Sequence, residues 1–125
     1  MNEKKHVKFS GKLVIVGFGS VGQGSLPLLL RHIDMPAERV SILTGDTRGI
    51  EEAKHFGIKF NVKPLTRENY KSVLDPLLAK GDFLLNLSVE VSSVDLIEYC
   101  CRRGVMYLDT CIEPWLGGYY DTSVS

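Results

Sequence analysis

Apolar residues fall in short runs along the chain, and five of these runs have the length and composition of β-strands. The first run, residues 13–16, is apolar at every position, which is typical of a strand buried on both faces in the middle of a parallel sheet. The later runs are rich in β-branched and aromatic residues. They cover residues 40–44, 58–62, 83–87 and 105–108.

Segments with helical periodicity separate these strands. Apolar residues three and four positions apart predict a helix over residues 20–33, with Val21 and Leu28 among the residues on its apolar side. Further helices are expected over residues 50–56, 66–79 and 93–103. Thr66 is the expected N-cap of the second of these. Strands and helices that alternate in this way predict a doubly wound, parallel α/β sheet of the Rossmann type, with strand order 3-2-1-4-5.

The first strand leads directly into the pattern Gly-x-Gly-x-x-Gly. We expect Gly17 to make the tight turn, Gly19 to let the backbone approach a pyrophosphate, and Gly22 to let the next helix pack closely. The N–H groups at the start of that helix then face the anion. The placement between a buried strand and a helix predicts a dinucleotide site rather than a purely structural glycine turn. Its expected residues are Gly17, Phe18, Gly19, Ser20, Val21 and Gly22.

An acidic residue follows the second strand, where dinucleotide-binding folds commonly hold the adenosine ribose. Asp46 is the acid nearest to the end of that strand, and Arg48 follows two positions later. If Asp46 faces the ribose, its charge repels a 2′-phosphate and selects NAD over NADP. If Arg48 faces it, the preference reverses. The alternative is a solvated turn aspartate beside Gly45.

Polar residues also end the fourth strand. Asn86 and Ser88 interrupt an apolar run, and strand alternation places their side chains on the same side. At the carboxyl end of a strand they are positioned either to contact the cofactor or to cap a turn. The sequence leaves both interpretations open.

The fifth strand is followed by the segment Leu-Asp-Thr-Cys-Ile-Glu-Pro-Trp, residues 108–115. Extended geometry puts Asp109, Cys111 and Glu113 on one side. Two carboxylates near Trp115 and the tyrosines at 119 and 120 suit a cationic ligand, through ion pairing and attraction to ring faces. A surface loop with an aromatic anchor is the alternative.

Composition narrows the class of protein further. The 125 residues fit one domain, and the 15 basic and 15 acidic residues cancel, so nothing indicates a nucleic-acid partner. No apolar run approaches the length of a membrane span and the N-terminus has no apolar signal core, so we expect a cytoplasmic protein without a membrane partner. The three cysteines and three histidines have neither disulfide nor metal-ligand spacing.

Four separate motifs, in order, carry a family resemblance. They are Gly-Phe-Gly-Ser-Val-Gly-Gln-Gly at 17–24, Leu-Leu-Leu-Arg-His-Ile at 28–33, Asn-Leu-Ser-Val-Glu-Val-Ser-Ser at 86–93 and Tyr-Leu-Asp-Thr-Cys-Ile-Glu-Pro-Trp at 107–115. Together they resemble the N-terminal part of the bacterial homospermidine synthases, which are related to saccharopine dehydrogenases. The likeness covers nearly the whole chain after the first ten residues.

The resemblance implies an NAD-dependent enzyme, usually a homodimer, that makes homospermidine from two putrescines or from putrescine and spermidine. Hydride passes from one amine to NAD⁺, ammonia is lost, a second amine condenses, and the hydride returns, so NAD is not consumed. The resemblance also implies that Glu113 helps to hold an ammonium group of the diamine. Asn86, Ser88 and Thr110 match positions on the nicotinamide side.

The domain organisation expected from these patterns is an N-terminal extension over residues 1–10 and a cofactor-binding domain over residues 11–125. Residues 115–125 would lead into a substrate domain that this chain lacks, so the chain alone is expected to bind cofactor without turnover. Two other interpretations remain. One is another oxidoreductase related to saccharopine dehydrogenase, and the other is a nucleotide-sensing regulatory domain without catalysis.

Overall fold

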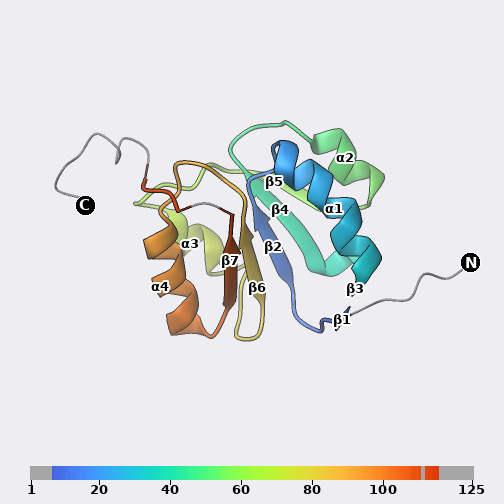
Figure 1. Ribbon diagram of the computed structural model, residues 1–125. Helices are drawn as coiled ribbons and strands as arrows, with labels where there is room; N and C mark the ends of the chain where they lie inside the picture. Colours follow the sequence, from blue (N-terminus) through green and yellow to red (C-terminus); the bar gives the residue numbers. More distant parts are fainter. Residues whose placement is uncertain (1–6, 111, 116–125) are drawn as a thin grey trace, which may run out of the picture.

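The computed structural model describes residues 7–110 and 112–115, and its centre is a parallel sheet of five strands (Figure 1). The strands are β2 (Leu13–Val16), β4 (Val40–Thr44), β5 (Lys59–Val62), β6 (Phe83–Asn86) and β7 (Met106–Asp109). They lie in the order β5-β4-β2-β6-β7, and every neighbouring pair is parallel. Numbered along the chain, this is the predicted order 3-2-1-4-5, so the doubly wound fold is confirmed.

Helices cover both faces of this sheet. Residues of α1 (Ser20–His32) and α2 (Ile50–His55) pack with Leu13 and Ile15 on one face. Residues of α3 (Tyr70–Leu74) and α4 (Ser93–Arg103) pack with Val14 and Val16 on the other. Because successive residues of β2 enter opposite clusters, all four are buried, which explains the unbroken apolar run.

The helix predicted over residues 66–79 is wrong in length, because only Tyr70–Leu74 forms α3. Thr66 and Asn69 close a turn ahead of it: the Asn69 N–H donates to Thr66 Oγ1 (3.2 Å), and the Thr66 N–H donates to Asn69 Oδ1 (2.8 Å). After the helix, Pro76 has no N–H to continue the hydrogen-bond ladder, and its ring disfavours helical continuation. Side chains of this segment still join the core, as their spacing predicted.

The apolar face predicted for α1 is also partly wrong. Val21 and Leu28 are exposed, whereas Gly22 and Leu26 are buried. Close packing at Gly22 turns the row formed by residues 22, 26 and 29 toward the sheet, and Val21 and Leu28 then point outward.

Two short strands escaped prediction. β1 (Val7–Lys8) pairs in parallel with β3 (Ile33–Asp34), which directly follows α1. The 3-10 helix η1 (Ala37–Arg39) then leads into β4. Strands of two residues are too short to produce a recognisable alternation. Residues 7 and 8 of the expected N-terminal extension therefore form part of the ordered structure.

A buried aspartate joins three segments at the amino end of the sheet. Asp82, directly before β6, accepts the Lys12 N–H at Oδ1 (2.8 Å) and the Ala79 N–H at Oδ2 (2.8 Å). The Lys12 ammonium lies 3.5 Å from Oδ2. Asp82 thus ties the start of β2 and the chain after α3 to the start of β6, at the opposite end of the sheet from the strands' carboxyl ends.

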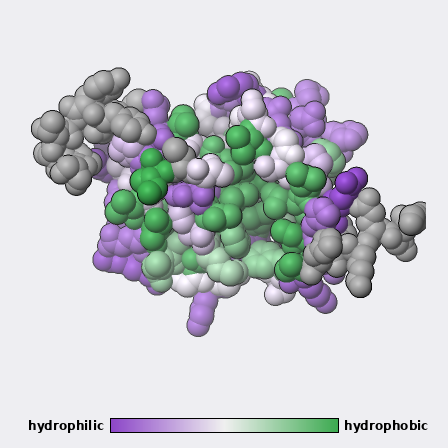
Figure 2. Space-filling view, in the orientation of Figure 1, coloured by the Kyte–Doolittle hydropathy of each residue, from purple (hydrophilic) through white to green (hydrophobic). Residues whose placement is uncertain are grey.

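The strand β7 lies at one edge of the sheet, and one of its sides is open. Tyr107 packs toward α4, whereas Met106 and Leu108 point to the other side, where they are 46% and 55% exposed. Figure 2, in the orientation of Figure 1, shows apolar side chains gathered over the middle of the molecule. In the described part of the chain, no helix has the length and apolar character needed to cross a membrane.

Candidate functional site

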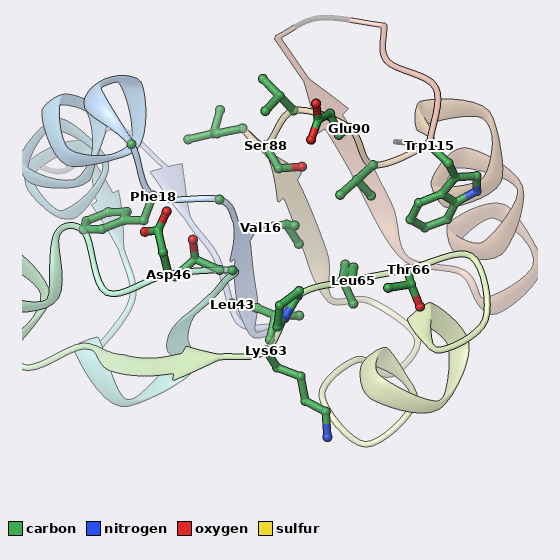
Figure 3. A pocket seen from close by; sticks show the side chains of 18 of the residues that line it. Val16, Phe18, Leu43, Asp46, Lys63, Leu65, Thr66, Ser88, Glu90 and Trp115 are labelled. Atoms are coloured by element: carbon green, nitrogen blue, oxygen red, sulfur yellow. The ribbon is translucent and has the colours of Figure 1, made fainter. Parts of the chain in front are cut away.

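The carboxyl ends of the strands surround a pocket of about 1000 Å³. Its walls are the loops that follow β2, β4, β5 and β6, with Trp115 beyond β7. Asp46 and Trp115 lie at opposite sides of this pocket, and Ser88 and Glu90 lie along the rim between them (Figure 3). The pocket therefore lies where strand order reverses, which is the position of ligands in doubly wound sheets.

The three glycines of the turn differ in what an added Cβ would meet. Gly17 has a φ of +87°, and a Cβ there would lie 2.7 Å from Ser88 Cα. A Cβ on Gly22 would lie 2.8 Å from the Phe18 ring. A Cβ on Gly19 meets no atom within 4 Å. Gly17 and Gly22 are thus needed by the fold itself, whereas Gly19 keeps clear a space that the protein does not fill.

Phe18, between the first two glycines, belongs to the core. Its side chain is 2% exposed, and its ring packs edge-on against Phe60 (6.2 Å between centroids). A Cβ on Gly49, which has a φ of +84°, would run into this ring. Phe18 therefore anchors the glycine turn in the core, and its ring lies against Gly49 in the β4–α2 loop.

Asp46 and Arg48 form an ion pair on the rim of the pocket. The Arg48 backbone N–H donates to Asp46 Oδ1 (2.9 Å), and the guanidinium donates to Oδ2 through Nε (3.3 Å) and Nη2 (3.2 Å). These hydrogen bonds, the backbone one first, hold the pKa of Asp46 below its usual range. The two candidate specificity residues are thus in direct contact, and the carboxylate is ionised at neutral pH.

A hydrogen-bond chain orients Ser88. Ser88 donates to Asn86 Oδ1 through its N–H (3.1 Å) and its hydroxyl (2.5 Å). The Asn86 amide donates to the Tyr107 hydroxyl (3.1 Å), which donates to Asp109 Oδ2 (2.8 Å). Burial, together with the hydrogen bond to Asp109, raises the pKa of Tyr107 to about 12, so the phenol stays protonated as a donor. Asn86 is 2% exposed and forms hydrogen bonds with both Ser88 and Tyr107. Of these three residues, only Ser88 lines the pocket.

The segment after β7 is fastened to the start of α4. Glu113 donates its N–H to Ser93 Oγ (3.0 Å) and accepts the Ser93 N–H at its carbonyl oxygen (2.9 Å). The Trp115 indole N–H donates to Asp95 Oδ2 (2.6 Å), and its ring lies 5.3 Å from that of Tyr70. Trp115 therefore anchors this segment in the core, with part of its side chain in the pocket wall.

The structure brings together only part of the predicted site. The pocket is lined by Gly17, Phe18, Gly19, Asp46, Ser88 and Trp115 among the predicted residues. Outside that lining lie Ser20, Val21, Gly22, Asn86, Thr110 and Glu113. Direct ligand contact by these residues stays a prediction. Cys111, Tyr119 and Tyr120 lie outside the described residues.

Sequence reasoning missed the wall contributed by residues 63–68, which follow β5. The rule that ligands lie beyond the carboxyl ends of strands applies to β5 as well, and it would have found this wall. The loop residues 89–91 belong to the motif at 86–93, but they were missed as pocket residues because their apolar or charged side chains do not by themselves indicate a ligand contact. Within residues 7–110 and 112–115, no group of His, Cys, Asp and Glu side chains is arranged to hold a metal ion.

The sheet order, the glycine turn and the pocket at the strand ends define a nucleotide-binding domain of the Rossmann class. Comparison with known proteins agrees with this class. The profile of the saccharopine dehydrogenase NADP-binding domain family matches residues 13–123, and the chain belongs to this family.

Individual proteins and a solved structure are also similar to this chain. The chain is 42% identical over 117 residues to a homospermidine synthase of Mesorhizobium japonicum and 40% identical over 119 residues to that of Blastochloris viridis. It also matches the crystal structure of a Legionella pneumophila homospermidine synthase in complex with NAD, with a TM-score of 0.85 and 33% identity over 89% of this chain. The chain spans 24% of the length of each of these three proteins.

Proposed function

We propose that this chain is the NAD-binding part of a homospermidine synthase. The observation that carries the proposal is the space in front of Gly19, which no protein atom fills although the turn is otherwise closely packed. A backbone without a Cβ at this position suits the close approach of a pyrophosphate. The similarity to homospermidine synthases, one of them solved with NAD, supports both the cofactor and the reaction.

In this proposal each wall of the pocket has a separate task. The Gly17–Gly22 turn and the first turn of α1 hold the pyrophosphate. Asp46 accepts hydrogen bonds from the adenosine ribose, and Ser88, oriented by Asn86, faces the nicotinamide side. NAD supplies the hydride acceptor that oxidises one amine and later returns the hydride. The chain's own contribution is to bind and orient, which is how proteins assist a redox cofactor.

The first test of the proposal is calorimetry of this chain with NAD and with NADP. We expect NAD to bind more tightly, because the Asp46 carboxylate repels a 2′-phosphate. In Asp46→Ala, NAD should bind more weakly by about 1.5 to 3 kcal/mol, the value of a hydrogen bond to a charged group. NADP should bind better than before, because Arg48 loses its present partner.

Arg48→Ala is the matched control for Asp46→Ala. It removes the other half of the ion pair, and NAD affinity should stay near that of the wild type while NADP gains nothing. A wild-type chain that prefers NADP would reject Asp46 as the ribose ligand and make Arg48 the candidate.

The proposed substrate is a diamine such as putrescine, and we propose that Glu113 helps to hold one of its ammonium groups. Support comes from the position of Glu113 beyond β7, where hydrogen bonds with Ser93 hold its backbone. Its side chain contacts Glu90, two residues after Ser88. In the longer, homodimeric enzyme to which we propose this domain belongs, Glu113→Gln keeps the shape of the side chain and removes its charge.

Homospermidine formation in that Glu113→Gln enzyme should fall steeply, with NAD affinity near wild type, because an ion pair to the substrate is lost and the cofactor contacts remain. Product formation measured with putrescine at saturating NAD checks this expectation. Normal turnover in the variant would overturn the role of Glu113 in substrate binding.

A further inference from the structure

We infer that Glu113 has a second task, as a positioning residue that holds the β6–α4 loop in the shape that lines the pocket. The inference rests on the proposed function in one respect only: the pocket is taken to be the NAD site. Residues 87–91 of this loop form one pocket wall. The Glu113 side chain contacts this loop at Glu90 and is not part of the pocket lining.

The contact that carries the inference joins two segments 23 positions apart. The Glu90 backbone N–H donates to Glu113 Oε1 (3.1 Å). Glu90 has a φ of +63°, and among the described residues it is the only one other than glycine with a positive φ. Left-handed backbone is unfavourable for a glutamate, so the loop needs a contact that compensates for it. A hydrogen bond to a carboxylate is a contact of sufficient strength.

Glu113 is suited to this task because its own backbone is fixed. Two hydrogen bonds with Ser93, at 2.9 and 3.0 Å, tie residue 113 to the first residue of α4. Ser92, the N-cap of α4, accepts the Asp95 N–H at 3.2 Å, which fixes the start of that helix. The carboxylate therefore reaches Glu90 from a residue whose backbone is fixed. The loop is held at Glu90 by Glu113 and, where it enters α4, by the hydrogen bond to Ser92.

The Glu113 side chain has two separate properties, an oxygen that accepts a hydrogen bond and a negative charge. Holding the Glu90 N–H requires an oxygen acceptor, which glutamine also provides. Holding an ammonium group requires the charge, which glutamine lacks. Glu113→Gln should therefore preserve the loop and the NAD site, whereas Glu113→Ala should disturb both.

The experiment compares Glu113→Gln and Glu113→Ala in this chain, with Glu98→Gln and Glu98→Ala as the matched pair. Glu98 is an exposed glutamate on α4 that pairs with Arg102. Amide hydrogen exchange of Glu90, measured by NMR without cofactor, reports the loop directly. Calorimetry with NAD reports the pocket, and thermal unfolding shows whether each variant is folded.

In Glu113→Ala we expect the Glu90 amide to exchange about tenfold faster and NAD to bind about tenfold more weakly, the factor that corresponds to 1.4 kcal/mol. Glu113→Gln should restore both values to near wild type, and neither Glu98 variant should change them. Unchanged exchange at Glu90 in Glu113→Ala would overturn the inference, and so would Glu113→Gln behaving like Glu113→Ala. If the wild-type chain fails to bind NAD, the proposed function fails, while the exchange measurement still decides whether Glu113 holds the loop.

Discussion

Gly19→Val is expected to abolish NAD binding and to leave the fold intact. The Cβ of a valine at this position lies in space that no protein atom occupies within 4 Å, so the packing around it tolerates the added side chain. It does fill the volume through which a pyrophosphate must approach the backbone. Calorimetry should show no binding at NAD concentrations that saturate the wild type, while cooperative thermal unfolding shows that the variant is folded. The midpoint should fall only slightly, because Gly19 is the N-cap of α1 and valine is a poor N-cap residue.

The matched control for this variant is Gly24→Val. Gly24 lies in α1, outside the pocket lining, and a Cβ there also meets nothing within 4 Å. The control should bind NAD with wild-type affinity. If Gly19→Val binds NAD normally while folded, the glycine turn is not the pyrophosphate site. Gly17→Val is unsuitable, because its Cβ would strike Ser88 and its φ is unfavourable for valine.

Asp82→Ala is expected to lower the free energy of unfolding strongly. The variant leaves the Lys12 and Ala79 N–H groups without their carboxylate partner at a buried position. Leaving these donors without their acceptor costs about 1 to 3 kcal/mol. That is a substantial part of the roughly 5 to 15 kcal/mol by which a folded domain is stable.

Urea unfolding of Asp82→Ala measures this loss, with Glu51→Ala as the control. Glu51 is exposed and lies 3.9 Å from the Lys54 ammonium, so its removal should change the free energy of unfolding by less than about 0.5 kcal/mol. NAD affinity of folded Asp82→Ala should be unchanged, because Asp82 lies at the opposite end of the sheet from the pocket. A loss below 1 kcal/mol, roughly the scale of an ordinary neutral hydrogen bond, would contradict the role given to Asp82.

The fold could be predicted because its strongest signals are local. The apolar run at 13–16 reflects burial on two faces, and the glycine motif reflects a turn with fixed geometry. The length of α3 was missed because Pro76 and the Thr66–Asn69 turn outweigh an apolar spacing that still serves the core. The exposure of Val21 was missed because the rotation of α1 is set by packing at Gly22 rather than by the helix's own pattern.

The candidate site was predicted less completely, because its details depend on contacts between distant segments. Asn86 was correctly placed at the end of β6, but its links to Ser88 and Tyr107 required the register of β6 and β7. The contact between Glu113 and the Glu90 N–H leaves no pattern in the sequence. In the sequence, Asp82 resembles an ordinary turn residue after Gly81, and only the tertiary structure shows it buried.

The open edge at β7 affects how the binding of NAD should be measured. In the described part of the chain no strand pairs with the outer side of β7, and Met106 and Leu108 project from one of its faces. Exposed edges and apolar faces of this kind promote association between molecules at high concentration. Calorimetry needs concentrated protein, so a titration at several protein concentrations separates cofactor heat from the heat of self-association. Fluorescence titration at lower protein concentration then provides an independent value for the same affinity.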